Sequence, residues 1–269
     1  MWDMHMHSEF SGDSETPMED MIRAAISQHL DGICFTDHHD LDYPKLPGEP
    51  DFFIDFDNYF PAAESLAGKY SRQLEILHGI ELGLQPQVAS ENSAIVKEHD
   101  WDFVIGSVHV VDHMDPYYGE YFKGRSEADS IRRYFEVTFD NVRNYTDFDV
   151  LGHIDYMVRY MPSGAADYNP SEYMEVLDEI FKIIIPRGQG IEINTSGYKA
   201  GLGYPNPHPD IIKRYRERGG EIITTGADAH VPEYVGFHFE DAKNILLANG
   251  FTHYCVFKGR KPNFMRLEK

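Results

Sequence analysis

Residues 1–39 read MWDMHMHSEFSGDSETPMEDMIRAAISQHLDGICFTDHH, in which an apolar segment, an amphipathic segment and a second apolar segment follow one another. The apolar segments 1–7 and 32–38 predict short strands. Between them, Thr16 as the N-cap and Pro17 as the first helical residue predict the start of a helix that ends near Leu30. A strand, a helix and a second strand in this order indicate a parallel pair of strands joined by a crossover helix.

The same alternation continues through the rest of the chain. Further strands are predicted at 74–82, 101–109, 149–154, 190–196 and 221–230, with a last one at 253–258. Helices are predicted at 57–72, 88–99, 127–145, 170–185, 209–218 and 239–248, and loops at 39–56 and 112–126. Seven strand–helix repeats without a second block of composition predict one α/β barrel domain over residues 1–269. An open doubly wound sheet stays the alternative, although no glycine-rich phosphate motif follows a predicted strand.

The chain is strongly acidic, with a formal net charge of -21 at pH 7. Such a surface repels nucleic acid, and it repels small anions unless positive ions are bound in the site. We find neither a signal-peptide pattern nor an apolar run of about twenty residues, so no membrane segment is predicted. Cys34 and Cys255 lie in apolar strand-like segments and are predicted to be buried reduced thiols, which favours a cytoplasmic protein.

Metal-binding side chains recur where the predicted strands end. Six of the seven predicted barrel strands end in histidines or carboxylates: His5, His7, Asp37, His38, His39, Glu81, His109, His153, Asp155, Asp228 and His230. In an α/β barrel the carboxyl ends of the strands meet at one mouth, where active sites are built. His5 and His7 are spaced i, i+2, as are Asp228 and His230, so each pair points to one face of its strand. This convergence predicts a metal centre at the mouth.

The remaining histidines and polar residues give weaker evidence for a functional site than the strand-end cluster does. One histidine at a strand end is more often a hydrogen-bonded structural residue than a ligand, and only the convergence of several strands changes that interpretation. The strand 190–196 offers Asn194 and Ser196. We assign no role to the histidines near helix ends and in loops, which are His29, His99, His208, His238 and His253, and a minor substrate role is open for His113.

Six segments, MHMHSEFSGDS, FTDHH, HGIELG, GSVH, GHIDY and GADAH, resemble motifs of the PHP superfamily (polymerase and histidinol phosphatase) and occur in its order. They span nearly the whole chain. Within the superfamily the chain looks most like the stand-alone histidinol-phosphate phosphatases. The resemblance implies a distorted (β/α)7 barrel of the TIM type with a site for three divalent metal ions.

The resemblance also implies which residues hold the ions. The first ion is expected on His5, His7, Glu81 and Asp228, the second on Asp13, His38 and His230, and the third on Glu81, His109 and His153, with Glu81 bridging. Asp13 stands where many relatives have a histidine, and a carboxylate shifts the preference towards harder metals. Zinc, manganese, iron or a mixture of them is therefore expected.

The implied reaction is hydrolysis of L-histidinol phosphate to L-histidinol and phosphate in histidine biosynthesis, by attack of a metal-bridging hydroxide. Asp228, His39 and Arg159 are the candidate catalytic residues, and the proton donor, a metal-site carboxylic acid or His39, stays open. The candidate substrate contacts are Arg159 and Lys199 for phosphate, Tyr117, and the carboxylates of Glu9 and Asp40 for the cationic part of the substrate. Asp155 is a further such carboxylate, or a residue that orients a ligand histidine.

Two other functions stay open. A related phosphoesterase of the same superfamily would act on nucleotides, cyclic diesters or phosphotyrosine, whereas DNA proofreading is disfavoured by the sequence pI of about 4.9. The alternative from another class is a non-catalytic metal-binding protein. Structural zinc sites are usually closed and built from cysteine and histidine, but the predicted ligands here include carboxylates and no cysteine.

Overall fold

The computed structural model describes residues 1–45, 48 and 50–268. Leu46, Pro47 and Glu49, which belong to the predicted loop 39–56, and Lys269 lie outside the described residues. Parallel strands form the centre of the fold in the order β1 (Trp2–Met6), β2 (Gly32–Phe35), β4 (Glu75–Gly83), β5 (Phe103–Ser107), β6 (Val150–Leu151), β7 (Gly190–Asn194) and β8 (Ile223–Gly226). The two-residue strand β3 (His38–His39) follows β2 and also pairs with β4.

The sheet closes on itself between the first and the last of these strands. The amide of Asp228 donates to the carbonyl of His5 at 2.8 Å, and the amide of His7 donates to the carbonyl of Ala229 at 2.9 Å. The result is a nearly closed parallel barrel of seven strands, which confirms the predicted distorted TIM-like barrel. Strands β2 and β5 are buried along their whole length, as parallel strands covered on both faces must be.

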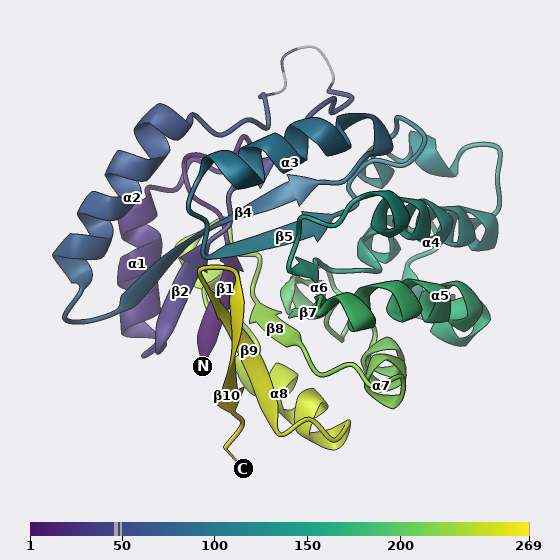
Figure 1. Ribbon diagram of the computed structural model, residues 1–269. Helices are drawn as coiled ribbons and strands as arrows, with labels where there is room; N and C mark the ends of the chain where they lie inside the picture. The colour runs from purple at the N-terminus through teal and green to yellow at the C-terminus, as the bar shows by residue number, and fades with distance from the viewer. Residues whose placement is uncertain (46–47, 49, 269) are drawn as a thin grey trace.

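Helices cover the outside of the barrel (Figure 1). They are α1 (Met18–Ser27), α2 (Phe56–Tyr70), α3 (Ala89–Glu98), α4 (Glu127–Asn144), α5 (Met174–Ile184), α7 (Pro209–Glu217) and α8 (Phe239–Ala248), whereas the short helix α6 (Ser196–Lys199) lies at the mouth, after the carboxyl end of β7. Helix α4 illustrates why they form: Ser126 accepts from the amide of Asp129 at its start, and Ile131, Tyr134 and Phe135 lie on its buried face. No helix among the described residues is long and apolar enough to cross a membrane.

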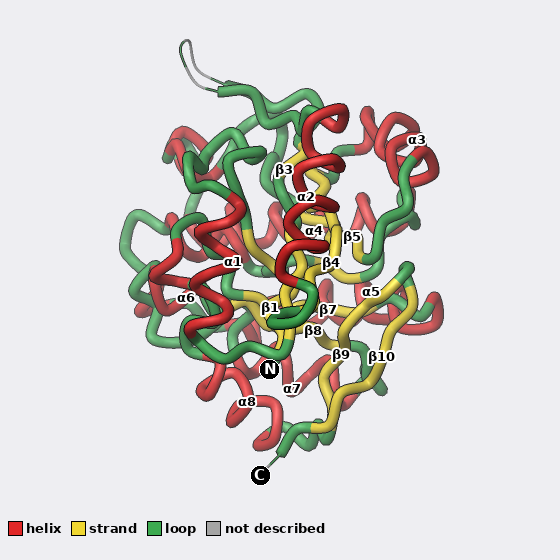
Figure 2. The backbone as a smooth tube through the Cα atoms, turned by 90° about the vertical axis from the view of Figure 1, so that its left-hand side faces the viewer, coloured by secondary structure: helices red, strands yellow, loops and turns green. Residues whose placement is uncertain are grey.

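The C-terminal segment adds a hairpin that the sequence pattern did not predict in full. The predicted strand 253–258 is β9 (His253–Lys258), and it pairs in antiparallel fashion with β10 (Lys261–Arg266). The hairpin lies near the N-terminus and β1 in both views (Figures 1 and 2). It leaves the opposite, carboxyl ends of the barrel strands free to form a site.

Hydrogen bonds join the turn after β1 to the segment after β8. Ser14 Oγ and Thr16 Oγ1 both donate to the carbonyl of His230, at 2.9 and 2.8 Å. Thr16 therefore does not cap α1 as the sequence suggested, and the carboxylate of Glu9 accepts the amide of Met18 at the start of that helix instead. These bonds hold the two ends of the barrel sequence together at the mouth.

Candidate metal centre

Glu81 is at the middle of a buried cluster of histidines. It comes from β4, its side chain is 0% exposed, and both carboxylate oxygens face imidazoles. Oε1 lies 3.0 Å from His153 Nε2 and 3.3 Å from His109 Nε2. Oε2 lies 3.0 Å from His38 Nδ1 and 3.2 Å from His5 Nε2, yet it has no hydrogen-bond partner. A buried carboxylate oxygen surrounded by ring nitrogens without a hydrogen bond has the surroundings of a metal ligand.

Asp228 completes the inner part of the cluster. Its Oδ1 lies 3.3 Å from His7 Nε2 and 3.8 Å from His5 Nε2. The two histidine nitrogens face each other at 3.1 Å. Two imidazole nitrogens and two carboxylates that converge on one point, from β1, β4 and the segment after β8, suit a divalent cation bound by nitrogen and oxygen.

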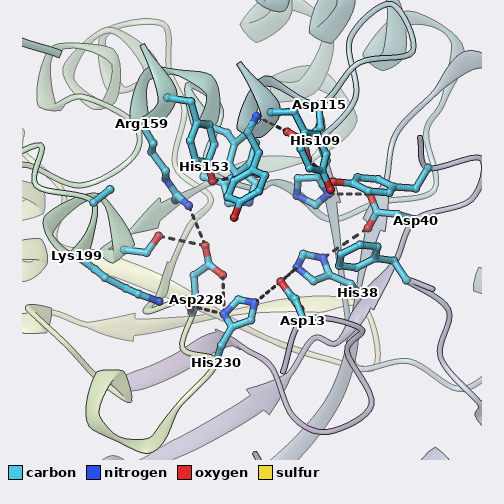
Figure 3. A pocket seen from close by; sticks show the side chains of 18 of the residues that line it. Asp13, His38, Asp40, His109, Asp115, His153, Arg159, Lys199, Asp228 and His230 are labelled. Atoms are coloured by element: carbon cyan, nitrogen blue, oxygen red, sulfur yellow. Dashed lines mark hydrogen bonds and ion pairs between the residues drawn. The ribbon is translucent and has the colours of Figure 1, made fainter. Parts of the chain in front are cut away.

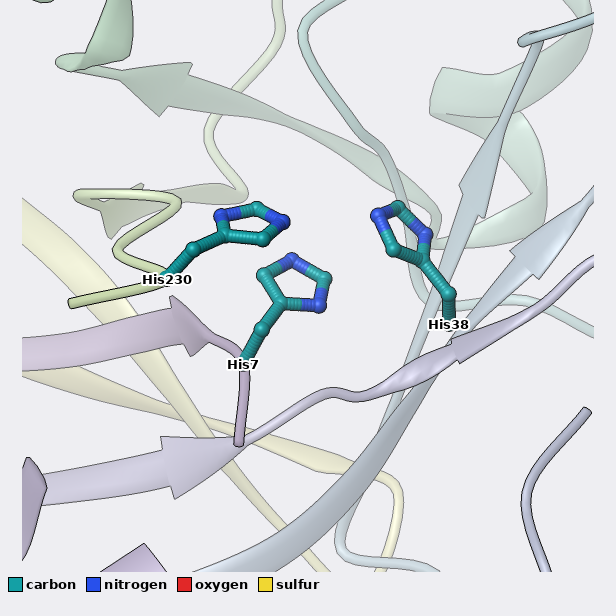
Figure 4. Close-up of side chains that lie close together, drawn as sticks. All are labelled: His7, His38 and His230. Carbon is teal, nitrogen blue, oxygen red and sulfur yellow. The ribbon is translucent and has the colours of Figure 1, made fainter. Parts of the chain in front are cut away.

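Asp13 belongs to an outer group that opens towards solvent. Its side chain is 38% exposed, and its Oδ2 lies 3.0 Å from His230 Nε2 and 3.6 Å from His38 Nε2. The ring of His7 contacts those of His230 and His38, at centroid distances of 4.1 and 4.2 Å (Figure 4). The predicted second set of ligands is thus brought together, and His38 also reaches Glu81.

Four triads of ligand atoms have spacings that fit one cation. Within each triad the atoms lie within 4.8 Å of one another: His5, His7 and Glu81; His5, His153 and Asp228; His38, Glu81 and His109; and His7, His38 and His230. All nine predicted metal ligands lie in this cluster, whereas their division among three ions stays a prediction.

The carboxylates in the cluster stay ionised although they are buried. Burial opposes ionisation of Glu81 and Asp228, but the neighbouring histidines hold the pKa of both carboxyls well below the usual range. Burial lowers the pKa of His5, but Glu192, Glu81 and Asp228 together raise it well above its ordinary value. Burial and the neighbouring His230 and His38 lower the pKa of His7 to about 3. The anionic groups therefore attract a cation, and divalent ions fit these donors.

Glu192 is a functional residue that the sequence analysis missed. It lies on β7, is 1% exposed, and its Oε1 is 2.7 Å from His5 Nδ1. Its Oε2 accepts from the amide of His153 at 3.0 Å and from Asn194 Nδ2 at 3.1 Å. By accepting the Nδ1 proton it directs Nε2 of His5 into the cluster. The i, i+2 spacing of Glu192 and Asn194 among isoleucines was the available signal.

A pocket of about 700 Å³ opens above the metal cluster (Figure 3). Arg159 and Lys199 lie on one side of it, and Asp40 and His38 lie on the other. Arg159 donates from Nε to Asn206 Oδ1 at 2.8 Å and from Nη2 to Asn194 Oδ1 at 3.3 Å. These bonds fix the plane of a guanidinium that is 9% exposed and faces Asp228. The pocket thus combines metal-binding side chains with two cationic groups.

A family model described as PHP domain matches residues 3–196. The chain belongs to the PHP domain family. It is 34% identical over 242 residues to a probable histidinol-phosphatase of Clostridium acetobutylicum, which covers 90% of this chain and 91% of that relative. It is 29% identical over 263 residues to the histidinol-phosphatase of Lactococcus lactis subsp. lactis, which covers 96% of this chain and 95% of that relative.

Solved structures of the PHP domain family share the fold over nearly the whole chain. The crystal structure of histidinol phosphate phosphatase from Lactococcus lactis, complexed with zinc, L-histidinol and phosphate, has a TM-score of 0.89 at 29% identity. It covers 97% of this chain and 98% of its own. The resemblance stated from the six sequence motifs is confirmed.

The predicted substrate residues fall into two groups. Arg159, Lys199, Tyr117 and Asp40 line the pocket, and Tyr117 is 62% exposed there. Lys199 Nζ lies 4.7 Å from the ring centre of Tyr234, and Asp40 Oδ1 lies 2.8 Å from His109 Nδ1, so Asp40 orients that histidine. Glu9 and Asp155 do not line the pocket.

Glu9 and Asp155 have other bonds that explain their placement. The carboxylate of Glu9 accepts a hydrogen bond from the amide of Met18 at the start of α1. Asp155 is fully buried and accepts from Asn206 Nδ2 at 2.6 Å and from the amide of His208 at 2.9 Å. It therefore holds Asn206, which in turn holds Arg159. Neither carboxylate lies in the wall of the pocket.

His39 does not point into the site, which corrects its selection as a catalytic candidate. Adjacent residues of a strand face opposite sides, so when His38 reaches the cluster His39 must point away. It is 5% exposed, stacks on Phe56 at 5.3 Å, and accepts the amide of Ile54 at Nδ1. It is absent from the pocket lining.

We therefore expect His39→Asn to lower kcat for phosphate release by less than about threefold, because Asn Oδ1 replaces the acceptor of the Ile54 amide. Loss of a general acid would lower kcat by about 100-fold or more. Steady-state kinetics and a melting curve of the variant check this, with His38→Asn as the matched variant that should lose activity. A 100-fold loss in a His39→Asn protein that melts normally would contradict the placement.

Proposed function

We propose that this protein hydrolyses L-histidinol phosphate to L-histidinol and inorganic phosphate. This proposal depends mainly on the cluster of eight histidine and carboxylate side chains from the carboxyl ends of distant strands, with Asp13 beside His230, under a pocket that also contains Arg159 and Lys199. The names of the relatives and the L-histidinol and phosphate in the Lactococcus lactis structure support the substrate.

Three divalent ions fit the donors of this chain, with zinc, manganese and iron as the expected metals. His5, His7, Glu81 and Asp228 would hold the first, Asp13, His38 and His230 the second, and Glu81, His109 and His153 the third. The hydrogen-bond-free Oε2 of Glu81 supports this assignment. When bound, such ions lower the pKa of water and attract the phosphate oxygens.

Two cationic side chains of the pocket contribute to binding the phosphate group. Arg159, fixed by Asn194 and Asn206, presents a planar guanidinium that can donate two hydrogen bonds to phosphate. Lys199 adds a second positive charge on the same side of the pocket (Figure 3). Together they attract a dianion into a protein whose net charge would otherwise repel it.

Asp228 is the remaining catalytic candidate among the carboxylates and histidines named from the sequence, because His39 faces away. Its side chain lines the pocket, and its Oδ2 accepts from Ser196 Oγ at 3.1 Å and lies 3.4 Å from Arg159 Nη1. We propose that this carboxylate accepts a hydrogen bond from the attacking water and so orients it, because the neighbouring histidines hold the pKa of Asp228 too low for the side chain to keep a proton. The buried free thiols of Cys34 and Cys255 support a reducing, cytoplasmic location.

The proposal is tested by phosphate release from a panel of esters, with and without a chelator. Phosphate release should stop in chelated protein and return with zinc or manganese. The kcat/KM for L-histidinol phosphate should exceed that for AMP, phosphotyrosine and a cyclic dinucleotide by about 100-fold or more. Undiminished turnover by metal-stripped protein would refute the mechanism, and a higher kcat/KM for another ester would refute the substrate. Bound metal without turnover of any ester would support a non-catalytic metal-binding protein.

A further inference from the structure

Four carboxylates line the pocket, and Asp115 differs from the other three in what surrounds it. Asp13, Asp40 and Asp228 each lie close to an imidazole nitrogen, at 3.0, 2.8 and 3.3 Å respectively. Over residues 1–45, 48 and 50–268, no lysine, arginine or histidine nitrogen lies within 4.0 Å of the Asp115 carboxylate. Its negative charge is thus without an ion-pair partner in the part of the chain that the structure describes.

Asp115 is nevertheless buried, and only neutral groups donate to it. The side chain is 4% exposed. Its Oδ2 accepts from Tyr43 Oη at 2.6 Å, and its Oδ1 accepts from the amide of Tyr117 at 2.8 Å. Burial raises the pKa of the Asp115 carboxyl, which reflects the cost of an ionised group in this position.

A structural role alone does not account for the charge. Asp115 caps the short 3-10 helix Pro116–Tyr118 through the amide of Tyr117. Asparagine caps a helix about as well as aspartate and carries no charge. A buried carboxylate without a cation costs more than a neutral amide in the same place. The charge is therefore suited to a cation that enters the pocket from outside the chain.

The surroundings of Asp115 also favour an organic cation. Six aromatic side chains line the pocket, namely Tyr43, Phe52, Tyr117, Tyr118, Tyr156 and Tyr160. Their rings form a wall that begins at the metal cluster: His153 to Tyr156 is 4.9 Å, Tyr156 to Tyr160 is 5.1 Å, and Tyr160 to Tyr117 is 5.6 Å between centroids. Aromatic faces attract ammonium and imidazolium groups.

The pocket is therefore polarised. Arg159 and Lys199 lie on one side, and Asp115 lies away from them, next to His109 and on the side towards Asp40 (Figure 3). Glu9 and Asp155, two carboxylates that the sequence suggested for a cationic substrate group, lie outside the lining, and Asp40 is already paired with His109. Asp115 is left as the pocket carboxylate able to receive a new cation.

We propose that Asp115 binds the positively charged nitrogen group of the leaving alcohol and so selects cationic phosphate monoesters over uncharged ones. This inference rests on the proposed phosphatase function of the same site. The proposed ions, Arg159 and Lys199 would attract the phosphate, and Asp115 with the tyrosine wall would bind the cation. A substrate that has both a phosphate and a cationic nitrogen group is complementary to the Arg159 side and the Asp115 side of the pocket.

The test compares Asp115→Asn with the wild-type holoenzyme on esters that differ in charge. Asparagine retains an acceptor for the Tyr117 amide and removes the charge. We expect kcat/KM for L-histidinol phosphate to fall about 10- to 100-fold, mainly through KM, as for loss of one charge-assisted hydrogen bond. The kcat/KM for glycerol 3-phosphate, whose alcohol is uncharged, should change by less than about threefold. Asp115→Glu should restore part of the preference.

Two further esters identify which nitrogen group is bound. 2-Aminoethyl phosphate has the ammonium without the imidazole, and 3-(imidazol-4-yl)propyl phosphate has the imidazole without the ammonium. The ester whose kcat/KM falls in Asp115→Asn contains the recognised group. Calorimetry compares the affinities of the wild type and Asp115→Asn for L-histidinol without turnover. The Kd should be about 10- to 100-fold higher in the variant.

Asp167→Asn is the matched control, because Asp167 is exposed and its loss changes the net charge equally. An equal fall on charged and uncharged esters, or no fall on either, would overturn the role of Asp115. If the wild type prefers another cationic ester and Asp115→Asn abolishes that preference, the role of Asp115 stands while the proposed substrate fails. A wild type that prefers uncharged esters overturns the role.

Discussion

Replacing Glu81 with glutamine is expected to lower kcat for phosphate release by about a thousandfold or more and to reduce the metal content of the purified protein. Both oxygens of Glu81 face imidazoles, with His109 and His153 on Oε1 and His5 and His38 on Oε2. Glutamine retains the shape but has no negative charge and places an NH2 group against two of those rings. The variant thus removes the group that joins the predicted ion sites.

Elemental analysis and steady-state kinetics measure the two effects of Glu81→Gln. The control is Glu75→Gln on the same strand β4, where the side chain is 51% exposed and pairs with Lys258. That control should keep its metal and its kcat. A Glu81→Gln protein with full metal content and wild-type kcat would show that the carboxylate does not bridge ions.

Replacing Arg159 with lysine is expected to lower kcat/KM for L-histidinol phosphate by about 100-fold, although the positive charge is kept. The guanidinium is held by Asn206 on Nε and by Asn194 on Nη2, so its plane is fixed relative to Asp228. Lysine makes neither this pair of bonds nor two parallel bonds to phosphate. The inhibition constant of inorganic phosphate should rise in the same variant.

Arg143→Lys is the control for Arg159→Lys, because Arg143 lies on the exposed face of α4 over the ring of Phe139. It should leave both constants unchanged. An Arg159→Lys enzyme with wild-type kcat/KM would mean that a point charge is sufficient at this position, and the proposed phosphate clamp would be wrong.

The barrel could be predicted because each strand–helix repeat has a recognisable local sequence pattern. Short apolar strands, helical periodicity and polar strand ends are local features, and the i, i+2 pairs at 5–7 and 228–230 place their members on one face. The metal cluster was predicted from the polar strand ends, because the carboxyl ends of parallel strands meet at one mouth of the barrel. The hairpin partner β10 was missed because its residues Lys261–Arg266 have mainly exposed side chains and no alternating apolar pattern.

The parts that were missed depend on three-dimensional contacts. Glu192 is inside a strand rather than at its end, so only the closed barrel, in which its side chain on β7 reaches His5 on β1, shows that it orients that histidine. Asp115 lies in a loop segment, where spacing predicts no direction for a side chain. The orientation of His39, in contrast, was available from the sequence, because His38 and His39 cannot face the same side of a strand.

Closure of the barrel between β1 and β8 has a consequence for how the protein assembles. His5 and Asp228 are separated by most of the chain, and the two backbone bonds at this seam are made by the ligand residues or their neighbours. Both bonds need the segment Asp228–Ala229, so the seam forms late in synthesis, after most of the chain has been made. If the proposed ions bind ligands on both sides of the seam, they stabilise the closed chain over the open one by mass action, and the folded state then depends on the metal supply.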